Sequence, residues 1–410
     1  MTVEQQKQIS TLLNEIARTL DVTKAEYNAI TTSYQAVGKH LAESPSMLKA
    51  YRPQIRPQGS FLLGTAVRPV AEDGDLDIDL VCELTRKPSS WTQYNTKQAV
   101  GDRLKESATY REMLDKEGKR CWTLKYADGK YHMDILPCFV NEDYPTALEK
   151  MLASSDSEIT DTTAIRITDK TLRNYYNETD TNKWVKSNPF GLAKWFYNIA
   201  YRPSSFNRSI MLNEAIAPVP KYYETKSTLQ RVIQLLKRHR DITFINNGDD
   251  KPISMIITVL AAKAYDDSID LFSALKNIVF NMTTYIDGTP GHRMVKNPVN
   301  PEENFADKWP THPKRKENFF KWLRQVKSDV ENIMNARGLQ LRENVGSAFG
   351  EEFSKKMFNS MADQHKQTAI NAGLDAVGVS WGCRSREELE SFSPLAVVDT
   401  CEEIFNIIQK

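Results

Sequence analysis

Asp75-Leu76-Asp77-Ile78-Asp79-Leu80-Val81 is the stretch of this 410-residue sequence that decides the fold. Three aspartates alternate with apolar residues, and side chains two apart in an extended chain point to the same face. The pattern therefore predicts a β-strand with one acidic face and one buried face. A row of carboxylates beside an apolar sheet is costly unless cations neutralise it, so the strand also predicts bound Mg²⁺.

The spacing leaves open which two aspartates hold the metal, because Asp75 with Asp77 and Asp77 with Asp79 are equally far apart. We choose Asp77 and Asp79. They alternate with apolar residues and run into Val81, whereas Asp75 ends the turn-like run 71–75. Asp75 is then expected to be a turn residue or to support a metal ligand.

A third carboxylate, Asp134, lies in the β-prone stretch 131–136. An Asp-Gly pair separates this stretch from the run 121–126, and such a pair between two β-prone runs predicts a hairpin. In a two-metal scheme, Asp77 and Asp79 would bridge both ions and Asp134 would bind the ion at the attacking hydroxyl. His132 shares the face of Asp134 and either borders the site or is a structural imidazole.

Gln58-Gly59-Ser60 precedes the acidic strand and predicts a turn that binds phosphate. Glycine lets the backbone approach an anion closely, and the serine hydroxyl and nearby amides can donate to phosphate oxygens. Mg²⁺ completes its shell with water and substrate phosphates, which a nucleoside triphosphate supplies. A Gly-Ser pair alone is usually an ordinary loop, so the prediction depends on its order ahead of the aspartates.

Taken in order, the Gly-Ser turn, the Asp-x-Asp strand and the later aspartate resemble the nucleotidyltransferase superfamily that includes DNA polymerase beta, poly(A) polymerase and oligoadenylate synthase. A narrower resemblance, over about residues 50–310, is to the bacterial cyclic-oligonucleotide synthases, the CD-NTases related to cyclic GMP-AMP synthase. The stretches that carry the narrower resemblance are Gln58–Thr65, Leu229–Asp241, Pro252–Met255 and Asn297–Trp309.

The resemblance implies an α+β fold, in which a polymerase-beta-like nucleotidyltransferase lobe with a mixed sheet packs on a helical lobe. We expect residues 1–180 to form an N-terminal helix plus the catalytic lobe, and residues 181–410 to form the helical nucleotide-binding lobe. It also implies a two-ion Mg²⁺ site at Asp77, Asp79 and Asp134, with Mn²⁺ as a substitute.

Three further site residues are implied by the resemblance alone. Lys237 and Ser254 match positions that hold the triphosphate in the relatives, and Asn297 matches a region that touches the bases. Without the upstream carboxylates, an ordinary solvated face is the simpler explanation of the basic residues on the helix that carries Lys237, and the alternative for Ser254 is a plain helix N-cap.

The function implied is synthesis of a cyclic di- or trinucleotide second messenger from ATP, with or without GTP, in antiphage signalling. Its product would bind a downstream effector that the sequence does not identify. The alternative is a template-free nucleotidyltransferase that acts on RNA, protein or a small molecule. A catalytically inactive nucleotide-binding sensor is a third class, which the acidic cluster argues against because a pure binder does not need it.

Composition limits the partners. The chain has 54 basic and 53 acidic residues, so its net field offers little attraction to a long polyanion. Its five cysteines lack the Cys-x-x-Cys spacing of zinc sites, so the zinc-bearing DNA-binding insertion of the animal synthase has no counterpart and we expect no requirement for duplex DNA. No stretch approaches the roughly 20 apolar residues of a membrane span, which favours a cytoplasmic protein without a membrane partner.

The remaining elements are predicted from periodicity and turn residues. We expect one long amphipathic helix over 3–41, a helix over 96–117, a crossover or loop over 145–180 and a partly flexible segment over 184–206. Further helices are expected over 226–242, 253–266, 269–286, 315–337 and 349–372.

Overall fold

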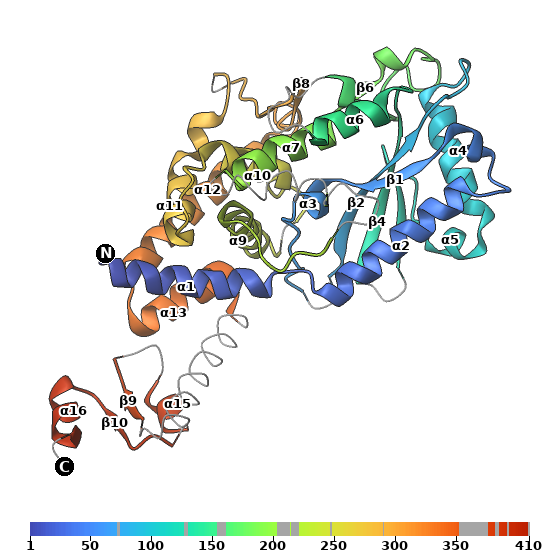
Figure 1. Cartoon of the computed structure of the whole chain (residues 1–410). Coiled ribbons are helices and arrows are strands. Elements are labelled where there is room, and N and C mark those ends of the chain that lie inside the picture. Colours follow the sequence, from blue (N-terminus) through green and yellow to red (C-terminus); the bar gives the residue numbers. More distant parts are fainter. Residues whose placement is uncertain are drawn as a thin grey trace.

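A mixed sheet and a lobe of helices lie side by side in the computed structural model (Figure 1). The structure describes residues 1–71, 74–126, 130–153, 161–202, 214, 221–246, 248–289, 291–351, 376–381, 385–391 and 393–408.

The main sheet has six strands in the order β1-β2-β4-β5-β6, and β3 also pairs with β4. Its strands are β1 (Gln54–Pro57), β2 (Leu76–Leu84), β3 (Trp122–Lys125), β4 (Tyr131–Phe139), β5 (Ile165–Ile167) and β6 (Val185–Ser187). Strands β2 and β4 are parallel and the other pairs are antiparallel, which confirms the predicted mixed sheet. The β3–β4 hairpin is also confirmed, although its turn residues 127–129 lie outside the described residues.

Two helices supply most of the apolar cover for one face of the sheet. They are α2 (Lys24–Ala42) and α4 (Gln93–Glu106), and α5 (Ala108–Met113) follows α4. Apolar residues of α2 and α4 join the buried side of β2 in one core, where Ile78 and Leu80 are fully buried. The acidic side of β2 therefore faces away from this core, as the alternating sequence predicts.

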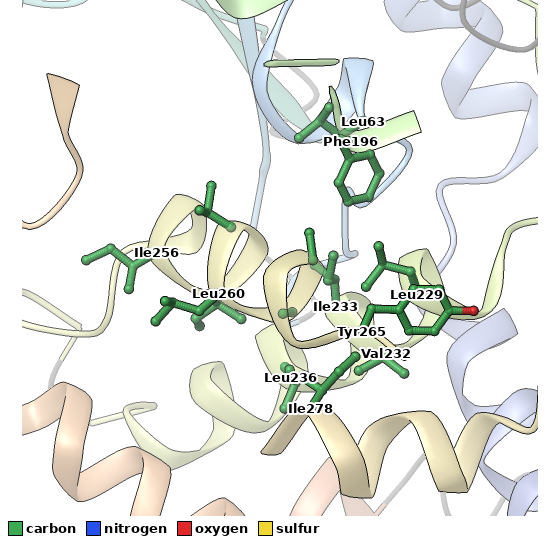
Figure 2. Packing of buried hydrophobic residues seen from close by; sticks show 14 of the residues in the cluster. Leu63, Phe196, Leu229, Val232, Ile233, Leu236, Ile256, Leu260, Tyr265 and Ile278 are labelled. Atoms are coloured by element: carbon green, nitrogen blue, oxygen red, sulfur yellow. The ribbon is translucent and has the colours of Figure 1, made fainter. Parts of the chain in front are cut away.

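The other face of the sheet meets a larger core that continues through the helical lobe. The helices that contribute are α1 (Val3–Thr19), α3 (Gly59–Leu62), α6 (Tyr144–Ala153), α7 (Pro189–Ala200), α9 (Thr228–Thr243), α10 (Ser254–Ala264), α11 (Leu271–Asn281), α12 (Pro313–Asn335) and α13 (Gly338–Phe349). Figure 2 shows Leu229, Val232 and Ile233 of α9 packed among residues of the neighbouring helices.

Helix α9 is buried on all sides. Its apolar stripe is confirmed, but its basic residues are enclosed too: Arg231, Lys237 and Arg238 are 5%, 4% and 1% exposed. The alternative of an ordinary solvated face is therefore wrong. Burying such charges is costly, so each must be held by specific acceptors.

The smaller elements complete the described chain. Short 3₁₀ turns are η1 (Met47–Tyr51), η2 (Asp161–Thr163), η3 (Thr181–Lys183) and η4 (Met282–Tyr285). The strands β7 (Lys296–Asn297) and β8 (Asn300–Asn304) form a hairpin next to β6. Near the C-terminus, β9 (Val377–Val379) pairs in parallel with β10 (Ala396–Val398), accompanied by α15 (Arg386–Glu390) and α16 (Cys401–Ile408).

The predicted single helix over 3–41 is wrong, because the chain forms two helices that pack on different parts of the molecule. Helix α1 ends at Thr19, and Thr23 begins α2 with a capping box that includes Glu26. Such a box satisfies the free N–H groups of a new helix start. Helix α1 packs on α9 and α11, whereas α2 packs on the sheet. The domain boundary at 180 stays a prediction.

Other boundaries also differ. The expected helix over 96–117 starts earlier and breaks at Ser107, whose side chain caps α5. Helix α6 lies in the expected crossover, and the segment expected to be partly flexible contains α7, which Asn188 caps and Pro189 starts. Helix α13 was not predicted, and most of the helix expected over 349–372 lies outside the described residues. Of the helices the structure describes, none has the length and apolar character needed to cross a membrane.

Candidate active site

The three predicted carboxylates come together on the face of β2 and β4 that points away from the core formed with α2 and α4. In the parallel register of these strands, Asp79 is paired with Asp134 and Asp77 is paired with His132. Residues paired in this way, and residues two apart on one strand, point to the same face. The register therefore places Asp77, Asp79 and Asp134 on one surface.

Asp77, His132 and Asp134 form a compact group that could hold a metal ion. One ligand atom from each lies within 4.8 Å of the others. Asp79 lies next to this group, and its Oδ2 atom faces Gly59. Carboxylate oxygens are the ligands that Mg²⁺ and Mn²⁺ prefer, so the donor set fits a hard divalent cation. His132 is the member that the predicted ligand set did not include.

The pKa shifts show the cost of gathering these carboxylates. Burial and the charges of Asp77 and Asp134 raise the pKa of Asp79 to about 7. Burial is also the largest cause that raises the pKa of Asp134. A hydrogen bond from His132 to Asp77, followed by one to Asp75, raises the pKa of the imidazole to about 9. A bound cation would relieve the same repulsion and favour the ionised carboxylates.

His132 and Thr123 hold the acidic residues in place. His132 Nδ1 lies 2.7 Å from Asp75 Oδ2 and its Nε2 lies 3.2 Å from Asp77 Oδ1. Asp75 thus lies just before β2 and supports the cluster, as expected. On the hairpin strand β3, the Thr123 hydroxyl donates to Asp134 Oδ1 at 2.5 Å. Thr123 was missed because only the strand register shows that it faces Asp134.

The Gly-Ser turn is fastened to the acidic strand. The backbone N–H of Gln58 donates to the Asp79 carbonyl at 2.8 Å. Gly59 has a φ of +58°, and a Cβ atom there would lie 2.2 Å from Asp79 Oδ2. Only glycine fits this conformation and this close approach without displacement. Ser60 follows directly and lines a cavity next to Asp77.

This first cavity, the Ser60–Lys237 cavity, has a volume of about 440 Å³ and lies between the sheet and the helical lobe. Its polar lining combines residues in or near α3 and the acidic strand with residues in or near α9 and α10. They are Ser60, Asp75, Asp77, Lys237, Arg240, Asp241, Lys251 and Ser254. Asp241 pairs with Arg240 at 2.8 Å and with Lys251 at 3.0 Å. Lysine and arginine side chains such as these can donate hydrogen bonds to phosphate oxygens.

Lys237 and Ser254 are both tied into this wall. The Lys237 ammonium donates to the Thr65 carbonyl at 3.0 Å and to its hydroxyl at 3.2 Å. Burial and the nearby charge of Arg240 lower the pKa of Lys237 to about 7. Ser254 Oγ accepts a hydrogen bond from Arg240 at 2.6 Å, and it is the first residue of α10, with Ile253 as the N-cap. The plain N-cap alternative for Ser254 is therefore wrong.

A second cavity, the Asn297–Glu303 cavity, has a volume of about 190 Å³. Gln58, Gly59 and Asp79 line it from the catalytic lobe. Asn297, which is 2% exposed, lines it from the β7–β8 hairpin together with Glu303. The two cavities thus adjoin the same Gly-Ser turn and the same acidic strand.

Several residues of these walls lie in the stretches that carry the resemblance but were not predicted as site residues. Thr65, Arg240 and Glu303 belong to different elements, and only the folded chain brings them beside the acidic strand. For Arg240 the one available signal was its place in a basic helix, which a solvated face would explain equally well.

The chain is similar in sequence to known proteins. Residues 1–171 match the family model of the Second Messenger Oligonucleotide or Dinucleotide Synthetase domain. The chain is 27% identical over 384 residues to a c-di-GMP synthase of Roseivirga ehrenbergii, covering 92% of this chain and 94% of the relative. It is 22% identical over 385 residues to the cyclic dinucleotide synthase CdnG of Bradyrhizobium diazoefficiens, covering 88% and 85% of the two chains.

Solved structures share the fold. The CD-NTase CdnG of Bradyrhizobium diazoefficiens, in complex with GTP, aligns with a TM-score of 0.65 at 20% identity and covers 87% of this chain and 99% of that one. The di-nucleotide cyclase of Vibrio cholerae, solved with ATP and GTP, aligns with a TM-score of 0.52 at 16% identity and covers 87% and 93%. The fold is thus that of the polymerase-beta-like nucleotidyltransferases, as predicted.

Fold, family match and acidic strand together define an enzyme of the nucleotidyltransferase class. More narrowly, its residues 1–171 match the synthetase-domain family model, and the chain is similar to bacterial cyclic dinucleotide synthases over most of its length.

Proposed function

We propose that this chain uses two divalent metal ions to join ATP, GTP or both into a cyclic di- or trinucleotide second messenger that acts in antiphage signalling. The observation that carries the proposal is the pairing of Asp79 with Asp134, beside Asp77 and next to the Ser60–Lys237 cavity. The relatives named as cyclic dinucleotide synthases support a cyclic product.

Asp77, Asp79 and Asp134 are the residues proposed to hold the metal ions, Mg²⁺ with Mn²⁺ as a substitute. When bound, such ions lower the pKa of an attacking hydroxyl and stabilise a leaving pyrophosphate. Thr123 keeps Asp134 directed at the site through its hydrogen bond. The fixed register of β2 and β4 supplies the rigid geometry that such a reaction needs.

The chain's other residues are proposed to bind and orient the nucleotides. Ser60, Lys237 and Ser254 would hold a triphosphate in the Ser60–Lys237 cavity, whose cationic wall suits phosphate oxygens. A second nucleotide would enter the Asn297–Glu303 cavity, on the other side of Gly59. Closing a ring then requires the linear intermediate to rebind with its triphosphate in the first cavity and its free hydroxyl near Asp134.

The test is product analysis combined with loss of the acidic pair. We expect the purified chain with Mg²⁺ or Mn²⁺ and labelled nucleotides to release pyrophosphate and form a phosphatase-resistant small oligonucleotide. The double variant Asp77→Asn with Asp79→Asn should lose at least about 100-fold in pyrophosphate release, because outer partners of metal ligands alone cost 10- to 100-fold. Its melting temperature should change little, because the relief of carboxylate repulsion offsets the loss of the Asp77–His132 contact.

The control is Asp102→Asn, which alters an exposed ion pair with Lys105 on α4. A double variant that turned over nucleotides normally would remove the acidic strand from the mechanism. Label transferred to added RNA, protein or a small molecule would favour the alternative nucleotidyltransferase reaction. The absence of a duplex DNA requirement, the downstream effector and a cytoplasmic location stay predictions.

A further inference from the structure

The Asn297–Glu303 cavity has a charge pattern unlike that of its neighbour. Its described charged lining residues are Asp79 and Glu303, both acidic, whereas the Ser60–Lys237 cavity combines lysine and arginine side chains with carboxylates. Because Asp79 is proposed to hold metal ions, Glu303 is the described charged lining residue left for the ligand, and a carboxylate without a cation repels phosphate and favours groups that donate hydrogen bonds. The part of a nucleotide that fits such a wall is therefore the base.

The remaining lining residues suit the flat faces of a base. Leu62, Met255 and Phe305 contribute apolar surface, and Asp79 places the cavity directly beside the acidic strand. Ligand pockets commonly combine apolar walls with a few polar groups that set orientation and specificity. Here Glu303 is a polar group that comes from the β7–β8 hairpin and not from the acidic strand.

Asn297 holds Glu303 in position. The Asn297 side-chain oxygen accepts from the Val299 N–H at 3.0 Å, and its amide donates to Glu303 Oε2 at 2.7 Å. Both ends of the Asn297 side chain are thus engaged, so it acts on a ligand through Glu303. The Glu303 carboxylate has two oxygens with about four lone-pair sites, which leaves room to accept further hydrogen bonds.

We propose that Glu303 recognises guanine through hydrogen bonds in the Asn297–Glu303 cavity. This inference rests on the proposed function. Guanine presents two adjacent donors, N1–H and the N2 amino group, and a carboxylate can accept both in parallel. Adenine presents an acceptor at N1 beside its amino group, so one carboxylate oxygen would face a lone pair. The same holds for cytosine at N3, and uracil presents a single N–H between two carbonyl groups.

Burial agrees with this role. Glu303 is partly enclosed, and burial raises its pKa although the side chains of Asn297 and Asn300 stabilise the ionised form. A partly desolvated carboxylate gains more from two further donors than an exposed one does. Sites that recognise a substrate through hydrogen bonds strongly reject analogues that lack the donor.

The experiment compares GTP, ITP and ATP, because inosine lacks the N2 amino group while keeping N1–H. Calorimetric binding and product formation are measured for the full chain and for Glu303→Gln. The full chain should prefer GTP over ITP, and ITP over ATP, each by about tenfold. In Glu303→Gln the preference for GTP over ATP, measured both in binding and in product formation, should fall by at least about tenfold.

Glu302→Gln is the matched control, because the neighbouring Glu302 is 75% exposed and pairs with Lys186. This control should keep the guanine preference of the full chain. An unchanged preference in Glu303→Gln, or equal use of GTP and ITP by the full chain, would overturn the assignment. Pyrophosphate release tests the proposed function separately. If the chain binds GTP selectively through Glu303 but releases no pyrophosphate, the assignment of the guanine pocket stands and the proposed reaction is wrong.

Discussion

Asp79 and Asp134 lie opposite each other on the parallel strands β2 and β4. A slip of one residue in this register would turn the Asp134 side chain to the apolar face, so strand pairing alone decides whether the two carboxylates meet. Burial is the largest cause that raises the pKa of each. The pair therefore carries a cost that a bound cation would offset.

Gly59→Ala should disturb Asp79 directly. The new Cβ would stand 2.2 Å from Asp79 Oδ2 at a φ of +58°. We expect pyrophosphate release to fall at least about tenfold and the free energy of unfolding to fall by about 1–2 kcal/mol from the left-handed backbone alone. Gly291→Ala is the control, since a Cβ there meets no atom within 4 Å. Full activity in Gly59→Ala would show that the Asp79 carboxylate need not approach the turn.

Thr123→Val should shift the acid side of the pH–rate profile. The Thr123 hydrogen bond lowers the pKa of Asp134, against the larger effect of burial, which raises it. Removing the bond raises that pKa further, so ionised Asp134 is lost at a higher pH and the acid limb should move up by about one pH unit.

Thr123→Ser keeps the donor and should keep the profile of the full chain. If the pH–rate profiles of Thr123→Val and Thr123→Ser coincide, the ionisation of Asp134 does not control the acid limb of the rate.

Lys237→Ala should mainly raise the KM for nucleotide. A hydrogen bond to a charged group is worth about 1.5–3 kcal/mol, which corresponds to roughly 10- to 100-fold in KM. Because the pKa of Lys237 is lowered to about 7, its ammonium is lost as pH rises through that value, and KM should increase above about pH 7.

Lys237→Arg keeps the charge at all these pH values and should remove this rise in KM. Steady-state kinetics from pH 6 to pH 9 measure both effects. An unchanged KM in Lys237→Ala would place the triphosphate elsewhere.

Asp21→Ala should lower the free energy of unfolding, because Asp21 connects the turn between α1 and α2 to α9. Asp21 Oδ2 lies 2.7 Å from Arg231 and Oδ1 lies 2.6 Å from Lys226, and the Arg231 and Asp21 side chains are 7% and 17% exposed. Losing one partner of a buried pair leaves the other charge uncompensated, which costs about 3–5 kcal/mol. Urea unfolding measures this loss, and Asp102→Ala, at an exposed pair, should cost under about 1 kcal/mol.

The same aspartate gives a pH dependence of stability. Burial alone would raise the pKa of Asp21, but the charges and hydrogen bonds of its partners, Lys226 first, lower it overall. Its folded pKa is below its unfolded value, so its contribution is present above about pH 4 and is lost as pH falls through the folded pKa. Asp21→Asn should make the free energy of unfolding fall less steeply as pH decreases. If the fall is equally steep in that variant, other groups cause it.

Local patterns were enough to predict the acidic strand and the Gly-Ser turn. Alternation around Asp77 and Asp79, the glycine at 59 and the hairpin before Asp134 depend on neighbouring residues along the chain, so the sequence alone carried them. Helix boundaries were less accurate, as the break before Thr23 shows. That break reflects a capping box and two separate packing partners, which periodicity in a single stretch does not reveal.

What the sequence by itself determined is therefore which side chains share the acidic face of β2, because backbone periodicity sets the face to which each side chain points. Only the tertiary structure decided that β2 lies parallel to β4, that the basic residues of α9 are buried, and that Glu303 shares a cavity with Asp79. These relationships involve segments far apart in the chain. Local conformational preferences do not distinguish between the possible pairings of such segments, so long-range packing selects among them.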